Sequence, residues 1–293
     1  MFIATIIAAD QMTQGDMSTF FARLKDAGCA PGEARWIDEG KAADIPFTSD
    51  PAAAQAALER AIEGIDVIVQ AEAGREKTLL ISDMDSTMIT IECIDELADY
   101  AGLKAEISDV TERAMRGELD FEEALDARVA LLKGLPVSTL DTCRTERVKI
   151  MPGAVELVRT MRARGARTIL VSGGFTVFAD AVAQEIGFER AVSNVLGIGG
   201  DVLDGTVARP IVGALTKQNV LKEELAALGL DAAASMAVGD GANDIPMIEA
   251  AGLGVAYHAK EKAAAAADAR IIYGDLSALL YAQGIARKDW VIA

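Results

Sequence analysis

The stretch from Thr78 to Thr90 reads TLLISDMDSTMIT, and this stretch decides the fold class. Its first half is a continuous apolar run of strand length, which is typical of a β-strand buried on both faces, as in a parallel sheet. Asp83 follows the run directly. It is therefore expected at the carboxyl end of the strand, where open α/β sheets place their ligand crevices.

Asp83 and Asp85 form a pair of acids just beyond this strand. They lie two residues apart, so in an extended chain both carboxylates point the same way. Two like charges in a partly dry site repel each other, and their natural partner is a hard cation such as Mg²⁺, which takes oxygen ligands. For this stretch alone, the plainer interpretation is a strand-to-loop exit with solvated acids.

Two further apolar runs of strand length end in residues with matching chemistry. The run 168–171 is followed by SGG, and the run 236–238 is followed by GDGAND. Strands that alternate with helices predict a parallel, doubly wound α/β sheet. Because the carboxyl ends of parallel strands share one edge of the sheet, we expect the three strand ends to converge on one crevice.

The residues at the two later strand ends complement the aspartate pair. Ser172, with the backbone N–H groups of the two glycines after it, would form an anion nest suited to phosphate oxygens. Asp240 would bring a third carboxylate to the cation. Asp244 would either orient the metal shell or pair with Lys217.

The chain divides into two predicted domains at a polar linker that ends near residue 75. Residues 1–75 show a βαβ-αβ pattern, which predicts a small α/β domain that resembles ACT-type ligand-binding domains. Residues 76–293 would form the larger domain, in which a helical block directly follows the aspartate-bearing strand, as expected of a cap or lid. Its predicted parts are a Rossmann-like core, 76–90 and 146–293, and a helical cap, 91–145.

The 293-residue chain has a formal net charge of −17, with 51% hydrophobic and 25% charged residues. This charge argues against nucleic-acid binding and against adhesion to an anionic membrane. An anionic substrate would need local arginine, lysine or a metal ion to meet it. The three cysteines are widely spaced and form no CxxC pair, so we expect reduced thiols in a cytoplasmic protein. The apolar run at residues 2–9 is too short for a signal peptide or a membrane span.

Four motifs, in order from about residue 76 onward, resemble those of the haloacid dehalogenase superfamily. The superfamily's DxDx(T/V) motif corresponds to DMDST at residues 83–87, and its strand that ends in Ser or Thr corresponds to Ser172. Its helical lysine corresponds to Lys217, and its GDGxND motif corresponds to residues 239–244. The related transporting ATPases carry Thr at the second aspartate, so Asp85 favours a phosphatase.

The resemblance implies hydrolysis of a phosphomonoester through a covalent aspartyl-phosphate. Asp83 would be the nucleophile, while Asp85 would give a proton to the leaving alkoxide and later take one from water. Mg²⁺ would be held by Asp83, Asp240 and the main-chain carbonyl of Asp85. A set of polar groups would hold the phosphoryl oxygens or the substrate: Ser172, Gly173, Lys217 and Asn243.

The predicted cap resembles, in particular, the cap of the phosphoserine phosphatase family. By this resemblance Glu92 would meet the substrate ammonium. Arg128 would clamp the substrate carboxylate, which a planar guanidinium fork matches well. Met115 and Phe121 would pack over the substrate. The resemblance therefore implies O-phosphoserine as the small-molecule substrate and a place at the last step of serine biosynthesis.

Two alternatives remain open at the level of sequence. One is a related phosphatase or phosphotransferase that acts on another small phosphorylated amino acid or alcohol. The other is an amino-acid sensor whose N-terminal domain binds serine, which the intact Asp83, Asp85, Lys217 and Asp240 argue against. The oligomeric state is also open, with a homodimer among the options.

Overall fold

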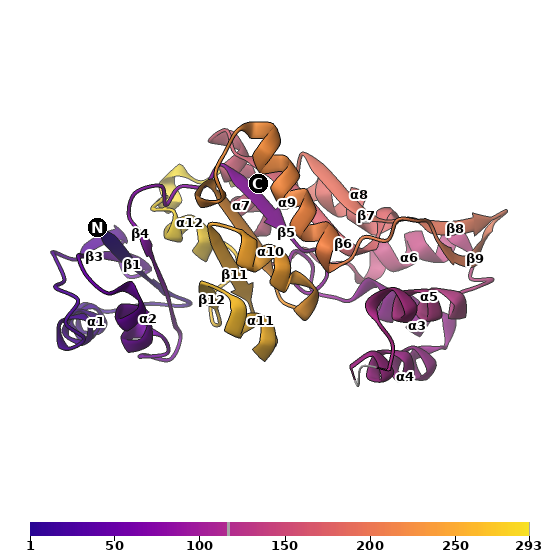
Figure 1. Cartoon of the computed structure of the whole chain (residues 1–293), viewed down its shortest axis with the longest axis horizontal. Coiled ribbons are helices and arrows are strands. Elements are labelled where there is room, and N and C mark those ends of the chain that lie inside the picture. Colours follow the sequence, from indigo (N-terminus) through magenta and orange to yellow (C-terminus); the bar gives the residue numbers. More distant parts are fainter. Residues whose placement is uncertain (116–117, 293) are drawn as a thin grey trace.

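The computed structural model of the chain describes residues 1–115 and 118–292. The molecule is elongated, with an N-terminal sheet at one end, a larger sheet in the middle, and a group of helices with a β-hairpin at the other end (Figure 1).

The central sheet has six parallel strands in the order β12–β11–β10–β5–β6–β7. β5 lies between β10 and β6, so the three strand ends singled out by the sequence are direct neighbours. This arrangement confirms the predicted doubly wound α/β fold. The strand bounds are β5 (Leu79–Ser82), β6 (Arg167–Phe175), β7 (Arg190–Asn194), β10 (Ser235–Gly239), β11 (Leu253–Tyr257) and β12 (Ala269–Ile271).

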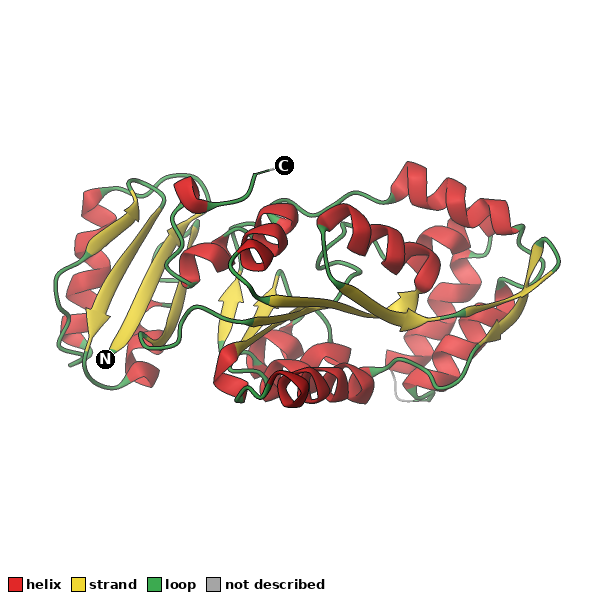
Figure 2. Cartoon of the chain, turned by 90° about the horizontal axis from the view of Figure 1, so that it is seen from above, coloured by secondary structure: helices red, strands yellow, loops and turns green. Residues whose placement is uncertain are grey.

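Helices cover both faces of this sheet (Figure 2). Leu80 of β5 packs into a cluster with α7 and α8, whereas Leu79 and Ile81 pack into a second cluster with α9 and α10. Because alternate residues of a strand point to opposite faces, burial on both faces requires the unbroken apolar run seen in the sequence. The helix bounds are α7 (Ala154–Ala163), α8 (Thr176–Ile186), α9 (Ala214–Leu228), α10 (Ile245–Ala250), α11 (Glu261–Ala266) and α12 (Ala278–Ala282).

A helical block is inserted between β5 and α7, where the sequence predicts a cap. It enters and leaves the core through two adjacent segments, which are joined by hydrogen bonds from Thr90 N to the Lys149 carbonyl (3.0 Å) and from Met151 N to the Met88 carbonyl (2.9 Å). We call these paired segments, residues 88–90 and 149–151, the cap hinge. The helices are α3 (Cys93–Ala101), α4 (Lys104–Met115), α5 (Phe121–Leu131) and α6 (Val137–Arg147).

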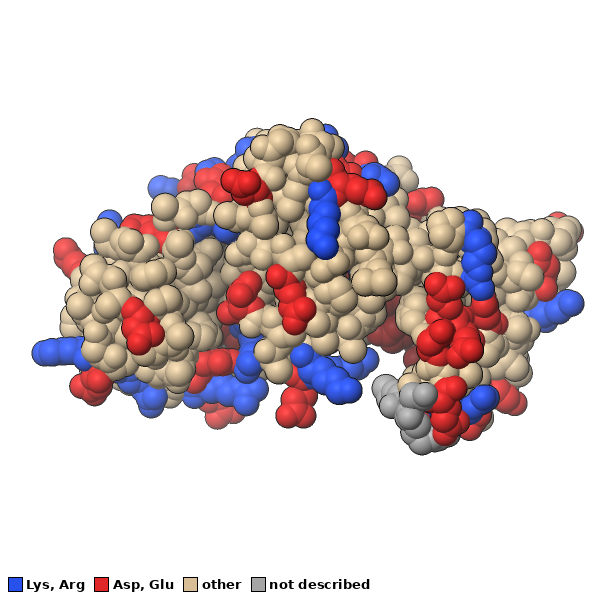
Figure 3. Space-filling view, in the orientation of Figure 1, with Lys and Arg blue, Asp and Glu red and all other residues tan. Residues whose placement is uncertain are grey.

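The glycine-rich region that follows β7 forms an antiparallel hairpin of β8 (Leu196–Gly199) and β9 (Val202–Val207). β9 packs against α5, so the hairpin contacts the cap. Acidic side chains gather over the cap on the face shown in Figure 3. None of the helices in the described part of the chain has the length and apolar character needed to cross a bilayer.

The N-terminal sheet has four antiparallel strands in the order β2–β3–β1–β4. The βαβ-αβ pattern predicted from the sequence missed one strand, β3. The residues of β3, AADIPF, include an aspartate and a proline, which are poor strand formers. In the structure, Asp44 is compensated by Thr5 (2.8 Å) and Arg75 (2.7 Å). The elements are β1 (Phe2–Ala8), α1 (Gln14–Asp26), β2 (Arg35–Asp38), β3 (Ala42–Phe47), α2 (Pro51–Leu58) and β4 (Ile65–Ala71).

Asp66 of β4 joins the N-terminal sheet to the core. Its buried carboxylate accepts hydrogen bonds from the backbone N–H groups of Ile272 (2.8 Å), Tyr273 (3.2 Å) and Gly274 (2.8 Å), just beyond β12. Burial raises the pKa of Asp66, while these three N–H groups oppose that rise. One side chain therefore satisfies three backbone donors of the other sheet's edge.

Replacement of Asp66 by alanine should lower the free energy of unfolding by about 3 kcal/mol, because it leaves backbone donors without an acceptor. Urea unfolding followed by circular dichroism would measure the loss. Asp66→Asn keeps one acceptor oxygen, so its free energy of unfolding should fall by less than that of Asp66→Ala. Equal stability of Asp66→Ala and the unaltered protein would contradict this account of the contact.

Candidate active site

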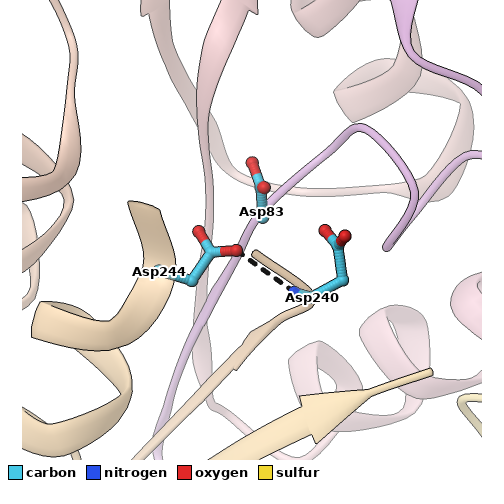
Figure 4. A group of neighbouring side chains, drawn as sticks. All are labelled: Asp83, Asp240 and Asp244. Atoms are coloured by element: carbon cyan, nitrogen blue, oxygen red, sulfur yellow. Dashed lines mark hydrogen bonds between the residues drawn. The ribbon is translucent and has the colours of Figure 1, made fainter. Parts of the chain in front are cut away.

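Three carboxylates meet at the carboxyl edge of the central sheet (Figure 4). Asp83 follows β5, Asp240 follows β10, and Asp244 ends the short helix η2 (Ala242–Asp244). One oxygen of each lies within 4.8 Å of the others, and all three side chains are buried. An all-oxygen set of this kind suits a hard divalent cation.

Lys217, in the first turns of α9, supplies positive charge to this cluster. Its Nζ lies 2.6 Å from Asp83 Oδ1 and 2.7 Å from Asp244 Oδ1, and its side chain is fully buried. Burial lowers the pKa of Lys217, but the charges of Asp244 and Asp83 raise it by more. The pKa of Lys217 therefore lies above its ordinary value. The lysine is therefore held in its charged form between two acids.

The single positive charge of Lys217 does not balance the negative charges of the three carboxylates. Burial, with repulsion from Asp244, raises the pKa of Asp83 well above its ordinary value although Lys217 opposes the rise. Burial and Asp244 likewise raise the pKa of Asp240 to about 6. Three acids that share one lysine are short of positive charge, and a divalent cation would supply it.

Asp244 also holds the loop that carries Asp240. Its Oδ2 accepts hydrogen bonds from the backbone N–H groups of Asp240 (3.1 Å) and Gly241 (3.0 Å). A Cβ on Gly239 would lie 2.4 Å from the Asp244 carboxyl carbon, so only glycine fits there. The sequence left two roles open for Asp244, pairing with Lys217 or orienting the metal shell. In the structure it contacts Lys217 through one oxygen and holds the Asp240 loop through the other.

Asp85 lies in a different environment from Asp83. The residue is half-buried, but its Oδ1 is shielded from solvent and has no hydrogen-bond partner among the described residues. Its Oδ2 accepts a long hydrogen bond from Cys93 N (3.4 Å). Burial, with repulsion from Glu92, raises the pKa of Asp85 to about 7. A carboxyl group in this state can give and take a proton near neutral pH.

Ser172 and the two glycines after it lie in the last part of β6, where the pairing with β7 shifts register. We call residues 172–174 the Ser172 turn. The buried Ser172 Oγ accepts a hydrogen bond from Gly174 N (2.8 Å). A Cβ on Gly174 would lie 3.3 Å from Asp85 Oδ2, and a Cβ on Gly173 would lie 3.2 Å from Phe121 Cζ. The turn therefore faces Asp85 on one side and the cap residue Phe121 on the other.

The cap residues predicted to recognise substrate differ in their exposure. Glu92 is exposed and its Oε1 accepts a hydrogen bond from Ser86 Oγ (2.6 Å). Arg128 is half-buried; burial lowers its pKa, whereas Asp95 and Glu92 raise it, which places both acids within electrostatic reach. The half-buried Asn243 folds back over Gly241. The Met115 side chain lies outside the described residues.

Known proteins share the sequence motifs and the fold described above. A family model described as haloacid dehalogenase-like hydrolase matches residues 77–252. The chain belongs to this family. A phosphoserine phosphatase of Albidiferax ferrireducens is 47% identical over 69% of this chain and 87% of the relative. A phosphoserine phosphatase of Archaeoglobus fulgidus is 45% identical over 71% of this chain and 61% of the relative.

The likeness to one solved structure extends over both sheets. The crystal structure of a probable phosphoserine phosphatase from Vibrio cholerae, in unliganded form, is 35% identical, with a TM-score of 0.78. The match covers 98% of this chain and 88% of that one. The sequence alignments are shorter, and this chain spans about three fifths of the length of the Archaeoglobus relative.

Two buried polar residues of this hydrolase site were given no role from the sequence, although Thr87 belongs to the quoted motif at residues 83–87. Thr87 Oγ1 donates a hydrogen bond to Asp240 Oδ1 (3.3 Å). Asn194, at the end of β7, donates from Nδ2 to the carbonyls of Gly173 (2.9 Å) and Val212 (3.1 Å), and its Oδ1 accepts from Val212 N (2.7 Å). Asn194 thereby ties the Ser172 turn to the segment that leads into α9. A polar residue that ends a strand is the signal that would have identified it.

Replacement of Lys217 by methionine should lower the free energy of unfolding by about 3–5 kcal/mol, because Asp83 and Asp244 then remain buried without their counter-charge. Urea unfolding in the presence of a chelator would measure this effect. Lys222 on the same helix is exposed and provides the matched control, since Lys222→Met should change the free energy by no more than about 0.5 kcal/mol. Equal losses in the two variants would contradict a structural role for the buried charge.

Proposed function

We propose that this chain is a Mg²⁺-dependent phosphatase that hydrolyses O-phosphoserine to serine and phosphate, the last step of serine biosynthesis. One observation carries the proposal: the carboxylate of Asp83 is held by Lys217 at a point where an acidic cluster and the Ser172 turn meet. The phosphoserine phosphatases to which the chain is 45–47% identical support the same reaction.

Asp83 is the nucleophile of the proposed reaction. Its Oδ1 interacts with Lys217 Nζ (2.6 Å) and accepts a hydrogen bond from Met84 N (2.8 Å), which fixes the carboxylate. An Asp83 oxygen forms a bond to phosphorus while the bond from phosphorus to the seryl oxygen breaks. Most of the rate enhancement then comes from positioning and charge stabilisation rather than from bond-making groups alone.

Asp85 carries the proton in both halves of the reaction. With its pKa raised to about 7, it holds a proton that it gives to the departing seryl oxygen. As a carboxylate, it then takes a proton from the water that attacks phosphorus and releases Asp83. The turn at Ser172 and Gly173, together with Lys217, holds the phosphoryl oxygens, and Asn243 hydrogen-bonds the substrate or phosphate.

The residues present fit a bound Mg²⁺ ion, because the buried acidic cluster lacks positive charge. Asp83, Asp240 and the main-chain carbonyl of Asp85 would hold the ion. When bound, it would neutralise the phosphoryl oxygens and the acidic cluster together.

Cap residues define the proposed substrate. Glu92 binds its ammonium and Arg128 its carboxylate, which distinguishes O-phosphoserine from simple phosphate esters. Phe121 packs over Gly173 and separates the turn from bulk water. Because acidic side chains gather on the cap surface, the anionic substrate depends on the positive charges of Lys217 and Arg128 inside the site (Figure 3).

The domain division at residue 75, with a cap at 91–145, is part of the same proposal, and the two separate sheets and the cap hinge support it. We also place the enzyme in the cytoplasm. The three cysteines are free and buried, which is consistent with a reducing compartment.

Removing the nucleophile or the proton carrier should have different kinetic effects. Asp83→Asn should abolish turnover of O-phosphoserine, whereas Asp85→Asn should lower kcat by about 100-fold to 10,000-fold with little change in KM. Phosphate release measured with Mg²⁺ and with a chelator, over a panel of small phosphate esters, would test both. Near-normal turnover by Asp83→Asn would show that the covalent scheme is wrong.

The pH dependence should follow the protonation of Asp85. Its raised pKa keeps the acid form present up to near neutral pH, so kcat/KM should fall as pH rises through that pKa. A bound cation favours the carboxylate form, and the midpoint should therefore move to lower pH as Mg²⁺ concentration rises. Rates measured from about pH 5 to about pH 9 would reveal this limb. An identical limb in Asp85→Asn would assign it to another group.

Arg128→Ala should raise KM for O-phosphoserine by about 10-fold to 100-fold, the loss expected for one charged hydrogen-bonded contact. O-phosphoethanolamine lacks the carboxylate, and its KM should be little affected. Arg144→Ala, on α6 of the cap, is the matched control and should change neither value. Equal effects of Arg128→Ala on both substrates would rule out the carboxylate clamp.

A further inference from the structure

One hydrogen bond fixes the carboxylate of Glu92. Ser86 Oγ donates to Glu92 Oε1 at 2.6 Å, a length typical of a hydroxyl that donates to a charged carboxylate. Within residues 1–115 and 118–292, the Glu92 carboxylate takes part in no other hydrogen bond and in no ion pair. The direction of this exposed side chain therefore depends on Ser86.

The backbone also connects Ser86 to the residues around Glu92. Ser86 N donates to the carbonyl of Ile91 (3.2 Å), so residues 86–92 form a closed loop, which we call the Glu92 loop. The loop contains the cap-hinge segment 88–90; Ser86 precedes this segment, and Glu92, the residue before α3, follows it. The side-chain hydrogen bond therefore spans the hinge and joins the start of the cap to the motif that carries Asp83 and Asp85.

Glu92 does not use its side chain to stabilise the helix that it precedes. It is the N-cap residue of α3, where a side-chain oxygen can accept hydrogen bonds from the first free N–H groups, but its side chain makes no such bond. The carboxylate instead bonds to Ser86 and lies within electrostatic reach of three site residues: Asp85, Asp240 and Arg128. The position of the carboxylate thus serves the site rather than the helix.

The backbone conformation of Ser86 indicates that its hydroxyl matters. Its φ is +56°, in the left-handed region that residues other than glycine rarely adopt. Glycine would adopt this conformation at a lower cost in free energy. What serine has and glycine lacks is the side chain, and the Ser86 hydroxyl is the group that holds Glu92. Strain of this kind is typical of functional sites.

Without this hydrogen bond, two effects would draw the Glu92 carboxylate away from the site. The side chain is long and exposed, so fixing it in one rotamer costs conformational entropy. The nearby carboxylates of Asp85 and Asp240 also repel it. A short hydrogen bond from Ser86 opposes both effects before any substrate is bound, which is the preorganisation that tight recognition requires.

We propose that Ser86 is a positioning residue whose hydroxyl holds the Glu92 carboxylate where the ammonium of the substrate binds. The hydroxyl thereby contributes to the selection of phosphate esters that carry an ammonium close to the ester oxygen. This role rests on the proposed function, because it concerns substrate recognition at the same site.

Steady-state kinetics with two esters test the role of Ser86. O-phosphoserine carries the ammonium, whereas 3-phosphonooxypropanoate has hydrogen in its place and keeps the carboxylate and the phosphate. The ratio of their kcat/KM values measures the preference for the ammonium. Ser86→Gly permits the same φ but removes the hydroxyl, so this ratio should fall by about 10-fold, through a higher KM for O-phosphoserine with little change in kcat. Ser86→Ala should produce the same fall.

Two controls separate positioning from a general effect on the loop. Thr90 also belongs to the Glu92 loop and is exposed, and its hydroxyl makes no hydrogen bond in the part of the chain that the structure describes. Thr90→Ala should therefore leave the ratio unchanged. In Glu92→Gln the ratio should already be low, and adding Ser86→Gly should lower it no further, because the two residues act through one contact. Circular dichroism at the assay temperature should show that both Ser86 variants are folded.

Several results would overturn the positioning role. These are an unchanged ratio in both Ser86 variants, an equal fall in Thr90→Ala, a further fall when Ser86→Gly is added to Glu92→Gln, or equal losses of kcat/KM for the two esters. Failure of the proposed function gives a different result. The unaltered protein would then not hydrolyse O-phosphoserine, or would hydrolyse both esters with the same kcat/KM, and the role of Ser86 would fall with it.

Discussion

The ammonium of Lys217 lies between the carboxylates of Asp83 and Asp244, and the geometry of the site depends on this contact. Burying an ion costs several kcal/mol unless opposite charge and hydrogen bonds compensate it. Lys217 provides that compensation for Asp83 and Asp244. Asp244 in turn accepts hydrogen bonds from two backbone N–H groups of the Asp240 loop and so holds this loop in place. Charge left over on Asp83 and Asp240 then favours a cation and a phosphoryl group in the space beside them.

The sheet order explains how distant parts of the chain reach this contact. β10, β5 and β6 are adjacent, so Asp240, Asp83 and Ser172 leave the sheet side by side although they are far apart in sequence. Close approach then requires glycine beside Asp240 and Ser172, because a Cβ at Gly239 would overlap Asp244 and one at Gly173 would press on Phe121. Asn194 fixes the Ser172 turn from the next strand. The site is thus built on strand ends, and the cap residue Phe121 lies against Gly173 beside it.

The parts of the fold that could be predicted are those whose signal is local. A doubly buried strand needs an unbroken apolar run, and residues 79–82 show one, so the central sheet and the acids beyond β5 followed from the sequence. β3 did not, because Asp44 is tolerated only through Thr5 and Arg75, which are remote in sequence. The contacts of Thr87 and Asn194 were not predicted for the same reason, since their partners are brought near only by the fold. The different environments of Asp83 and Asp85 also emerge only from burial in three dimensions.

The proposed reaction depends most directly on a bond between phosphorus and Asp83. The reaction of the full chain with phosphorus-radiolabelled O-phosphoserine and Mg²⁺ would be quenched in acid, and the label would be mapped after proteolysis. We predict an acyl phosphate on Asp83, released by hydroxylamine, and no such adduct in Asp83→Asn. Label on Ser172, or turnover with direct transfer of the phosphoryl group to water and no labelled protein, would contradict the account.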